Sequence, residues 1–309
     1  MPSCRRRTAD RKGRTIATTR STVGRYYDRN TRRFLLAGHG GRRLAIRRAV
    51  WGPGISDRDD AIDYVNSLVL GELRSLPIPS GREARVLDLG CGVGGGMLYL
   101  APRFPATYHG VTISRVQAEL GRRFIEERRV SSIEIHEADL TDRAYWEREA
   151  AAPFDLAYAV ESFIHVDRVL SELPLLAGQL RPGGRLIVVD DMISRSGARR
   201  WPARRERRWL NEFKRGWYAR GLASVEQFVA AGREAGLRLL EARDLTPYLE
   251  LDRPRDRAAG ILVSALRWLP LRPEWFNNLL GGNALQRALK RGLLGYYYLV
   301  FSADDGRTA

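Results

Sequence analysis

The stretch VLDLGCGVGGG, residues 86–96, decides the fold. Its apolar start has the composition of a buried strand, and Asp88 lies where that strand ends. Gly90, Gly92 and Gly94 allow the backbone to turn tightly and to approach a ligand closely. A dinucleotide-binding chain would carry an acidic residue about 20 positions later, at the tip of the second strand. That tip reads HGVTIS, without a carboxylate, so the loop favours a different nucleotide-like ligand.

Strand-like and helix-like patterns alternate on both sides of this loop. Such alternation predicts an α/β fold with a mostly parallel sheet and helices on both faces. The expected strands are 84–90, 107–113, 133–140, 154–162, 185–192, 237–245 and 295–303. Ligands of such sheets bind at the carboxyl ends of the strands, where the glycine loop also lies.

Two regions precede the core of residues 81–309, and an insert lies within it. Residues 1–20 are basic and poor in large apolar side chains, which predicts a mobile tail. Residues 21–80 read as a helical N-terminal cap that contributes to the substrate pocket and ends in a linker rich in proline. An insert at about 247–294 is rich in leucine and tryptophan. It reads either as a helical packing layer or as a lid or membrane-facing surface.

The chain is strongly basic, with a formal net charge of +16 over 309 residues. Such a charge suits nucleic acid, an anionic membrane or an anionic substrate. However, only three of the 52 basic residues are lysines. Such a low ratio of lysine to arginine is also typical of genomic base composition, without selection for an anionic partner.

Cysteine usage and hydropathy narrow the class of protein. Cys4 and Cys91 are too few for a disulfide framework or a cysteine zinc site. No apolar run reaches the roughly 18 residues needed to span a bilayer, and no apolar region follows the basic start as in a secretory signal. We therefore expect a soluble, cytoplasmic protein with at most peripheral membrane contact; a homo-oligomer stays open.

Five short motifs carry a family resemblance. In order, VLDLGCGVGGG, GVTIS, EADL, AVES and LRPGG resemble the class I S-adenosylmethionine-dependent methyltransferases. The GVTIS-x-x-Q pattern is similar to the branch that acts on lipid-like carbon skeletons. The Glu-Ser of AVES, together with YYDRNT near the start, looks most like the geranyl and farnesyl diphosphate C-methyltransferases. The resemblance implies a Rossmann-like seven-stranded sheet and S-adenosylmethionine as cofactor.

The resemblance also implies a set of cofactor-binding residues. The glycines would cradle the methionine part of the cofactor, with Asp88 supporting the loop. Thr112, Ser114 and Gln117 would contact the ribose in place of the usual acidic residue. Asp139 would accept a hydrogen bond from the adenine amino group, unless it only caps the next helix. The full set is Asp88, Gly90, Gly92, Gly94, Thr112, Ser114, Gln117, Asp139 and Leu140.

Glu161 ends the apolar run FDLAYAV, where an ionised carboxylate is costly unless it is paired or used. Methylating an alkene carbon leaves a carbocation that must lose a proton. A carboxylate in a dry pocket stabilises that cation and then acts as the base. Alternatively, Glu161 caps the following helix or pairs with an arginine. His165 follows four residues later, so it could orient the carboxylate, touch a diphosphate or remain purely structural.

Aromatic and polar side chains supply candidates for substrate binding. Aromatic faces stabilise carbocations, and a diphosphate requires arginines, other donors or a magnesium ion. The candidates are Arg25, Tyr26, Tyr27, Asn30, Trp51 and Phe163, with Arg33, Phe34, Trp201 and the basic run 194–208 as further ones. Asp190 and Asp191 end a strand and could hold Mg²⁺ or simply start a loop; the identity of any metal is left unknown.

The alternatives differ in the acceptor. Amino methylation of nucleic-acid bases usually requires an Asp/Asn-Pro-Pro-aromatic motif where this chain reads AVESFIH, so we predict no nucleic-acid partner. Oxygen or nitrogen methyltransferases of natural products often place a histidine base where His165 stands. Sterol or quinone methyltransferases would share nearly every motif. A non-enzymatic cofactor-binding module is a further alternative, against which the intact glycine loop argues. The sequence predicts C-methylation of an isoprenoid, with a prenyl diphosphate (isopentenyl, geranyl or farnesyl) as substrate and cyclisation of the cation left open.

Overall fold

The fold is described from a computed structural model. It describes residues 22–31, 35, 44, 47–149, 152–198, 202–251, 253–266 and 274–304. The predicted basic tail at 1–20 lies outside these residues, as do the candidates Arg33, Phe34 and Trp201.

A seven-stranded sheet forms the centre of the molecule, in the order β3-β2-β1-β4-β5-β7-β6. The strands are β1 (Ala84–Leu89), β2 (Ala106–Thr112), β3 (Ile133–Glu137), β4 (Phe154–Val160), β5 (Leu180–Ile193), β6 (Leu237–Asp244) and β7 (Leu294–Ala303). Strand β7 lies antiparallel to both of its neighbours, and the other paired strands are parallel. The predicted mostly parallel α/β sheet is confirmed.

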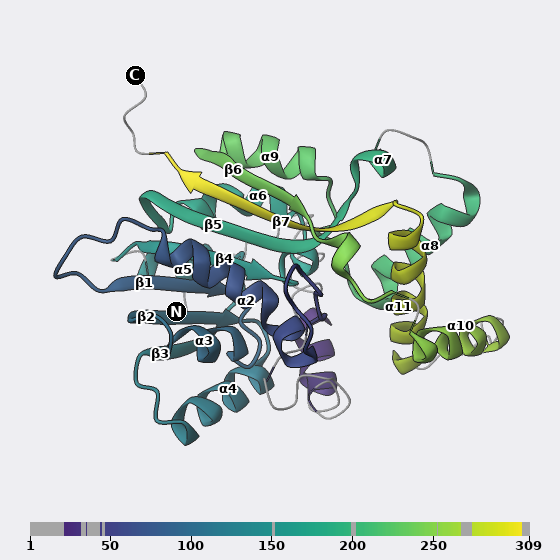
Figure 1. The fold of residues 1–309 in the computed structure, drawn as a ribbon, viewed down its shortest axis with the longest axis horizontal. Helices are drawn as coiled ribbons and strands as arrows, with labels where there is room; N and C mark the ends of the chain where they lie inside the picture. Colours follow the sequence, from purple (N-terminus) through teal and green to yellow (C-terminus); the bar gives the residue numbers. More distant parts are fainter. Residues whose placement is uncertain are drawn as a thin grey trace, which may run out of the picture.

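Helices cover both faces of this sheet (Figure 1). One face packs against α2 (Arg58–Arg74), α3 (Gly95–Leu100) and α4 (Arg115–Glu127) through a buried apolar cluster. The opposite face packs against α5 (Arg143–Glu149), α6 (Val169–Ala177) and α9 (Val225–Glu234) through a second cluster. Since both faces are covered, the central strands read as nearly continuous apolar runs.

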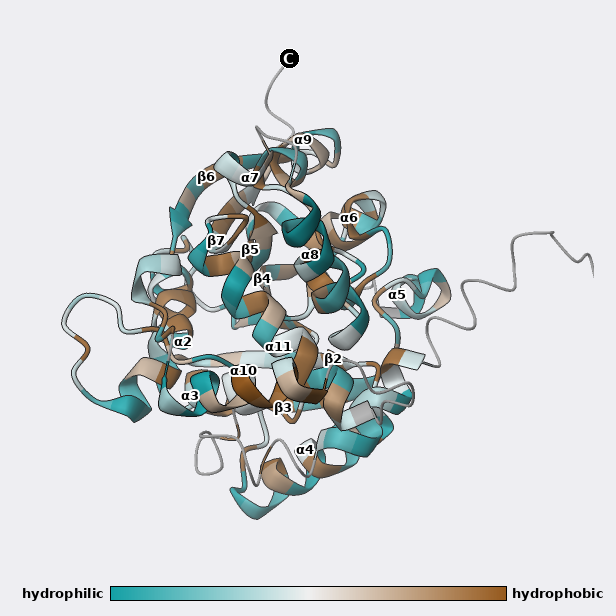
Figure 2. Cartoon of the chain, turned by 90° about the vertical axis from the view of Figure 1, so that its right-hand side faces the viewer, coloured by the Kyte–Doolittle hydropathy of each residue, from teal (hydrophilic) through white to brown (hydrophobic). Residues whose placement is uncertain are grey.

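The insert between β6 and β7 is helical, as expected. It contains the short turn η2 (Thr246–Tyr248), α10 (Pro254–Leu266) and α11 (Glu274–Lys290). Helix α11 packs on α8 (Arg204–Gly216), which follows the short α7 (Arg195–Ala198). These helices extend beyond one end of the sheet in Figure 1, and Figure 2 shows hydrophilic α8 beside the more mixed surface of α10 and α11. Among the described helices, none has the length and apolar character needed to cross a membrane.

Local sequence explains where several helices begin. The Ser114 hydroxyl accepts a hydrogen bond from the Gln117 amide and so caps α4. At α9, Ser224 and Gln227 form a reciprocal capping box. The first helix of the described chain, at residues 22–31, rests on the core through Asp28, whose carboxylate accepts hydrogen bonds from the Ser114 hydroxyl and the Val116 amide.

One expected boundary is wrong. The strand predicted at 185–192 is longer, because α6 ends at Ala177 and β5 begins at Leu180. The segment LRPGG pairs with the start of β4 across a shift in register between Phe154 and Leu156. Gly183 in this irregular segment has φ of +74°, a conformation that favours glycine.

Candidate active site

A cavity of about 670 Å³ opens at the carboxyl ends of β1, β2 and β4. The glycine loop after β1 forms one wall, because the chain turns there through residues with positive φ. Gly90, Gly92 and Gly94 have φ of +95°, +58° and +81°. A Cβ on Gly90 would lie 2.4 Å from the Ser162 Cβ, whereas one on Gly92 would meet no atom within 4 Å. Packing against Ser162 therefore requires glycine at position 90, whereas the space beside Gly92 is free of protein atoms.

Most of the predicted cofactor residues line this cavity. They are Asp88, Gly90, Gly92, Thr112, Gln117, Asp139 and Leu140. Thr112 donates a hydrogen bond to the Gln117 side chain (2.8 Å), and Asp139 accepts from the amide and hydroxyl of Thr141. The two hydrogen bonds from Thr141 fix the direction of the Asp139 carboxylate within the turn that the two residues share.

Two predicted cofactor residues lie behind the wall. Gly94 begins α3, and a side chain there would meet Ile135 and Met97 instead of the cavity. Ser114 is fully buried, and its hydroxyl both caps α4 and donates to Asp28. Its place in the motif is thus explained by helix capping and by docking of the N-terminal helix.

Asp88 lies buried beneath the glycine loop. The Tyr158 hydroxyl donates to its carboxylate at 2.7 Å. Burial raises the pKa of Asp88 to about 7, opposed by this hydrogen bond and by the charge of Arg47. Asp88 also lines the cavity, and its role in supporting the loop stays a prediction.

A second wall, formed by the segment after β4, contains Glu161 and His165, which both line the cavity. Glu161 follows β4 with φ of +52°, an uncommon conformation for a residue with a side chain. Its carboxylate accepts hydrogen bonds from the Tyr296 hydroxyl (2.9 Å) and the Arg48 amide (3.2 Å), and the Arg48 guanidinium lies 3.5 Å away. The expected pairing of Glu161 with an arginine is therefore present at the cavity wall.

Arg48 joins this carboxylate to Asp191. Its guanidinium donates two hydrogen bonds to the Asp191 carboxylate, at 2.9 and 2.7 Å, and stacks 4.3 Å from the centre of the Tyr296 ring. Asp190 accepts from the amides of Ile164 and Asp191. Both strand-end carboxylates are thus bonded within the protein, which leaves no open pair for Mg²⁺ among these two groups.

His165 is paired with Tyr27 from the N-terminal helix, with 2.7 Å between the phenol oxygen and Nε2. Burial raises the pKa of Tyr27 above its usual value, so the phenol stays protonated, and the direction of its hydrogen bond with Nε2 follows the tautomer of the ring. Nδ1 of His165 is buried and has no hydrogen-bond partner among the described residues. Burial lowers the pKa of His165 to about 4, so the ring is neutral at pH 7.

The other predicted substrate residues do not line the cavity. Phe163 is fully buried in the cluster beneath α6, and Arg25 is exposed on the N-terminal helix. Tyr26 packs between the Tyr27 and Tyr218 rings. Asn30 is buried and donates to the Tyr26 carbonyl, and Trp51 is half-buried and bonded through its amide to Tyr248. Of the aromatic candidates in the described chain, Tyr27 reaches the site.

Several residues of the site carry no local sequence signal. Arg47 lines the cavity, where it donates to Asn66 at 2.7 Å. Arg48 follows it, and Tyr296 comes from the last strand. Segments 135 to 143 residues apart meet here, as the Tyr296–Glu161 and Arg48–Asp191 contacts show, so only the folded structure brings them together.

The sheet order and the glycine loop define a class I methyltransferase fold. The family described as "Methyltransferase domain" matches residues 62–241, more than half of the chain. The chain therefore belongs to this family of S-adenosylmethionine-dependent methyltransferases.

Relatives agree with this assignment and differ in chemistry. The 27-O-demethylrifamycin SV methyltransferase of Amycolatopsis mediterranei is 31% identical over 201 residues, which cover 62% of this chain and 68% of that protein. The O-methyltransferase rstn1 of Aspergillus nomiae is 32% identical over 135 residues, 43% of this chain. The match spans only 58% of the length of rstn1.

Solved structures show the same fold. The geranyl diphosphate C-methyltransferase of Streptomyces coelicolor A3(2), in complex with Mg²⁺, geranyl diphosphate and S-adenosyl-L-homocysteine, superposes with a TM-score of 0.62 at 16% identity. The alignment covers 92% of this chain and 97% of that one. At this identity the likeness concerns the fold alone.

The cavity fits S-adenosylmethionine in size and charge. Its volume lies within the usual range of about 300–1,000 Å³ for small-molecule sites. Its described lining carries five acidic residues (Asp88, Asp139, Glu161, Asp167 and Glu172) and two arginines (Arg47 and Arg168). An acidic wall of this kind suits a cofactor that carries a sulfonium cation.

Proposed function

We propose that the protein transfers a methyl group from S-adenosylmethionine to a hydroxyl oxygen of a small, largely apolar acceptor, with His165 as the base. The observation that carries this proposal is the neutral imidazole at the cavity wall, hydrogen-bonded to Tyr27. This is the oxygen-methyltransferase alternative of the sequence analysis, and the O-methyltransferase relatives support it.

The proton has a defined path. S-adenosylmethionine, when bound, supplies an electrophilic methyl group on a sulfonium sulfur. As the acceptor oxygen bonds to that methyl carbon and the carbon–sulfur bond breaks, the hydroxyl proton must leave. In the tautomer that carries the ring proton on Nδ1, the Tyr27 oxygen accepts this proton while its own proton passes to Nε2 of His165, 2.7 Å away. General-base catalysis of this kind contributes typically about 10²–10⁴-fold.

The surroundings of His165 act on it in two opposite ways: burial keeps the ring neutral but weakens it as a base, and the smaller effect of nearby charge and backbone groups favours the protonated ring. The ring is neutral at pH 7, and the negative charge of Glu161 favours the imidazolium that forms when the proton arrives. Glu161 itself is held by Arg48 and Tyr296, so it acts on the ring through its charge.

The described lining favours a neutral acceptor. Of its two arginines, Arg47 donates to Asn66 through Nη1 and lies 3.7 Å from the Asp63 carboxylate, while its buried Nε and Nη2 have no hydrogen-bond partner among the described residues. Apolar side chains complete the wall, including Val23, Leu44 and Val160. A hydroxyl on an apolar skeleton matches this lining better than a diphosphate, which needs several cationic donors.

The test combines an acceptor panel with two variants. Wild-type protein, His165→Gln and Tyr27→Phe are incubated with S-adenosylmethionine and hydroxylated polyketides, phenols, prenyl alcohols and prenyl diphosphates, and products are identified by mass spectrometry. We expect O-methylation of one hydroxyl class, with kcat roughly 10²–10⁴-fold lower in His165→Gln and cofactor affinity unchanged. O-methylation that persists at full rate in His165→Gln would overturn the role of this base.

A second candidate is C-methylation of a prenyl diphosphate, with Glu161 as cation stabiliser and base. It is supported by the place of this carboxylate at the cavity wall. The same panel separates the two candidates: a methyl group gained on carbon of a diphosphate and lost in Glu161→Gln would establish C-methylation. If the product carries a methyl ether and Glu161→Gln retains substantial activity, this candidate is excluded.

A further inference from the structure

Three potential metal ligands gather at the β2–β3 edge of the sheet, outside the cofactor cavity. In the parallel register of these strands, His109 pairs with Glu134 and Val111 pairs with His136. Glu134 and His136 are two residues apart on β3, so their side chains lie on the same face. His109 shares that face from the neighbouring strand, beneath Tyr145 of α5.

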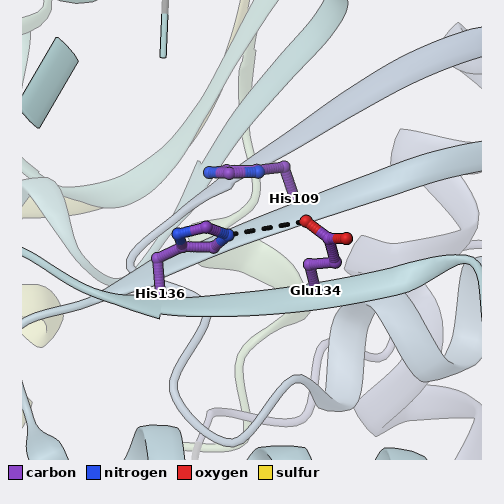
Figure 3. Close-up of side chains that lie close together, drawn as sticks. All are labelled: His109, Glu134 and His136. Atoms are coloured by element: carbon purple, nitrogen blue, oxygen red, sulfur yellow. Dashed lines mark ion pairs between the residues drawn. The ribbon is translucent and has the colours of Figure 1, made fainter. Parts of the chain in front are cut away.

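The side chains converge on one another (Figure 3). Their potential ligand atoms all lie within 4.8 Å of one another, and Nε2 of His136 lies 3.6 Å from the Glu134 carboxylate. The two imidazole rings stack with their centres 4.1 Å apart. Nε2 of His109 is hydrogen-bonded to the Tyr145 hydroxyl at 2.7 Å, which leaves Nδ1 as the nitrogen available to a ligand.

We propose that His109, Glu134 and His136 form a binding site for a divalent transition-metal ion, with Zn²⁺ as its preferred occupant. Two imidazole nitrogens and one carboxylate oxygen are ligands that zinc takes in tetrahedral sites, with water in the fourth position. A donor set of nitrogen and oxygen without thiolate fits Zn²⁺, Ni²⁺ or Cu²⁺ better than Mg²⁺ or Ca²⁺, which prefer oxygen alone.

The burial of the three residues suits an ion that enters from solvent. His109 is 7% exposed and held by Tyr145, so it forms a fixed anchor. A tyrosine on the other ring nitrogen is the kind of outer contact that orients metal-binding histidines. The side chains of His136 and Glu134 are 32% and 75% exposed, so they can close on an ion.

Only modest movement is needed. Zinc bonds of about 2.0–2.2 Å in tetrahedral geometry place ligand atoms about 3.4 Å apart. The His136–Glu134 pair already stands close to that separation. His136 must rotate out of its stack on His109, because both lone pairs have to point at the same ion. A bound ion would then clip the edge strand β3 to β2.

Zinc binding is measured by isothermal titration calorimetry on full-length protein without an affinity tag, in the wild type and in Glu134→Gln, His136→Gln and Glu137→Gln. Glu137 lies on the same strand with its side chain on the opposite face, so its variant is a matched control for charge. Cobalt substitution adds a spectroscopic readout, since tetrahedral Co²⁺ gives intense visible bands. The Tm measured by thermal unfolding with and without Zn²⁺ is a third readout.

We expect one zinc ion per chain in wild type and Glu137→Gln, with a rise in Tm. Affinity should fall in Glu134→Gln and His136→Gln by at least the 10–100-fold that loss of an outer contact typically costs. Zinc binding that is absent in the wild type, or equally strong in Glu134→Gln and His136→Gln, would overturn the proposal. Because Glu134 is exposed, its variant tests the site without disturbing the core.

Discussion

The two walls of the cavity are built in different ways. The cofactor wall comes from β1, β2 and β3 and the turns that follow them, so its residues Asp88 to Leu140 are close in sequence. The second wall, which holds Glu161 and His165, is supported by contacts that join Tyr27 to His165, Arg48 to Asp191 and Tyr296 to Glu161, pairs separated by 138, 143 and 135 residues. Short sequence motifs therefore predict the residues of the first wall, whereas the second wall is assembled by tertiary contacts between distant segments.

The largest effect is expected at Arg48, which belongs to the second wall. Arg48→Met leaves the Asp191 carboxylate, whose side chain is 4% exposed, without its bidentate partner. Removing one partner of a buried ion pair costs about 3–5 kcal/mol. Thermal unfolding should show a Tm lower by roughly 6–20 °C, at about 2–4 °C per kcal/mol.

The pH dependence and a double variant sharpen this prediction. Burial raises the pKa of Asp191, and the charge of Arg48 lowers it again. Without Arg48 the carboxyl is protonated more easily, so the loss of stability should be larger at pH 8 than at pH 5. Arg48→Met/Asp191→Asn should recover much of the loss, and equal stability of Arg48→Met and wild type would contradict the pairing.

The next effect is expected at Gly90 in the first wall. A Cβ there would lie 2.4 Å from the Cβ and 2.9 Å from the hydroxyl oxygen of Ser162, at φ of +95°. Strain and overpacking together cost about 2–4 kcal/mol. Gly90→Ala should therefore lower the free energy of unfolding by about this amount, and because the strained loop lines the cavity, it should also weaken binding of S-adenosylhomocysteine, as measured by calorimetry.

Gly81→Ala is the matched control. Gly81 also has positive φ, +81°, but a Cβ there meets no atom within 4 Å. It should cost about 1 kcal/mol of stability and leave cofactor affinity unchanged. If both variants bind the cofactor like the wild type, the glycine loop does not approach it closely.

This contrast explains what the sequence could predict. Seven strands, their mostly parallel order, the helical insert and most of the cofactor wall follow from apolar runs and short motifs. Such motifs cannot tell a side chain that faces the cavity from one that faces the core, so Ser114 and Phe163 were expected in the wrong surroundings. Arg48 carried no signal, because many arginines surround it in the sequence and its partners lie more than 100 residues away.

A smaller effect concerns pH and His165. Burial lowers the pKa of this histidine to about 4, while the charge of Glu161 and the backbone of Tyr218 and Trp217 oppose the shift. The unfolded chain binds a proton near pH 6.5 and the folded chain does not until about pH 4. His165 therefore makes the free energy of unfolding fall as pH drops from 6.5 to 4, with a slope of at most about 1.4 kcal/mol per pH unit.

Denaturant unfolding across this pH range tests the assignment. His165→Gln should flatten the dependence between pH 6.5 and 4 and leave the higher pH range unchanged. An identical slope in both proteins would mean that burial does not lower the pKa of His165 in the folded chain.

The smallest effect separates two neighbours that the sequence assigned to the same role. Ser114→Ala removes the cap of α4 and the hydrogen bond to Asp28, which should cost about 1–2 kcal/mol of stability. Because Ser114 lies behind the cavity wall, cofactor affinity should change less than about twofold from the wild-type value. That is a smaller effect than the loss of one ordinary hydrogen bond. Thr112→Val, which changes a residue that lines the cavity, should instead weaken cofactor binding about tenfold. Calorimetry measures cofactor affinity and thermal unfolding measures stability in both variants. If Ser114→Ala loses as much affinity as Thr112→Val, the serine contacts the cofactor. The motif would then predict more of the first wall than the structure indicates.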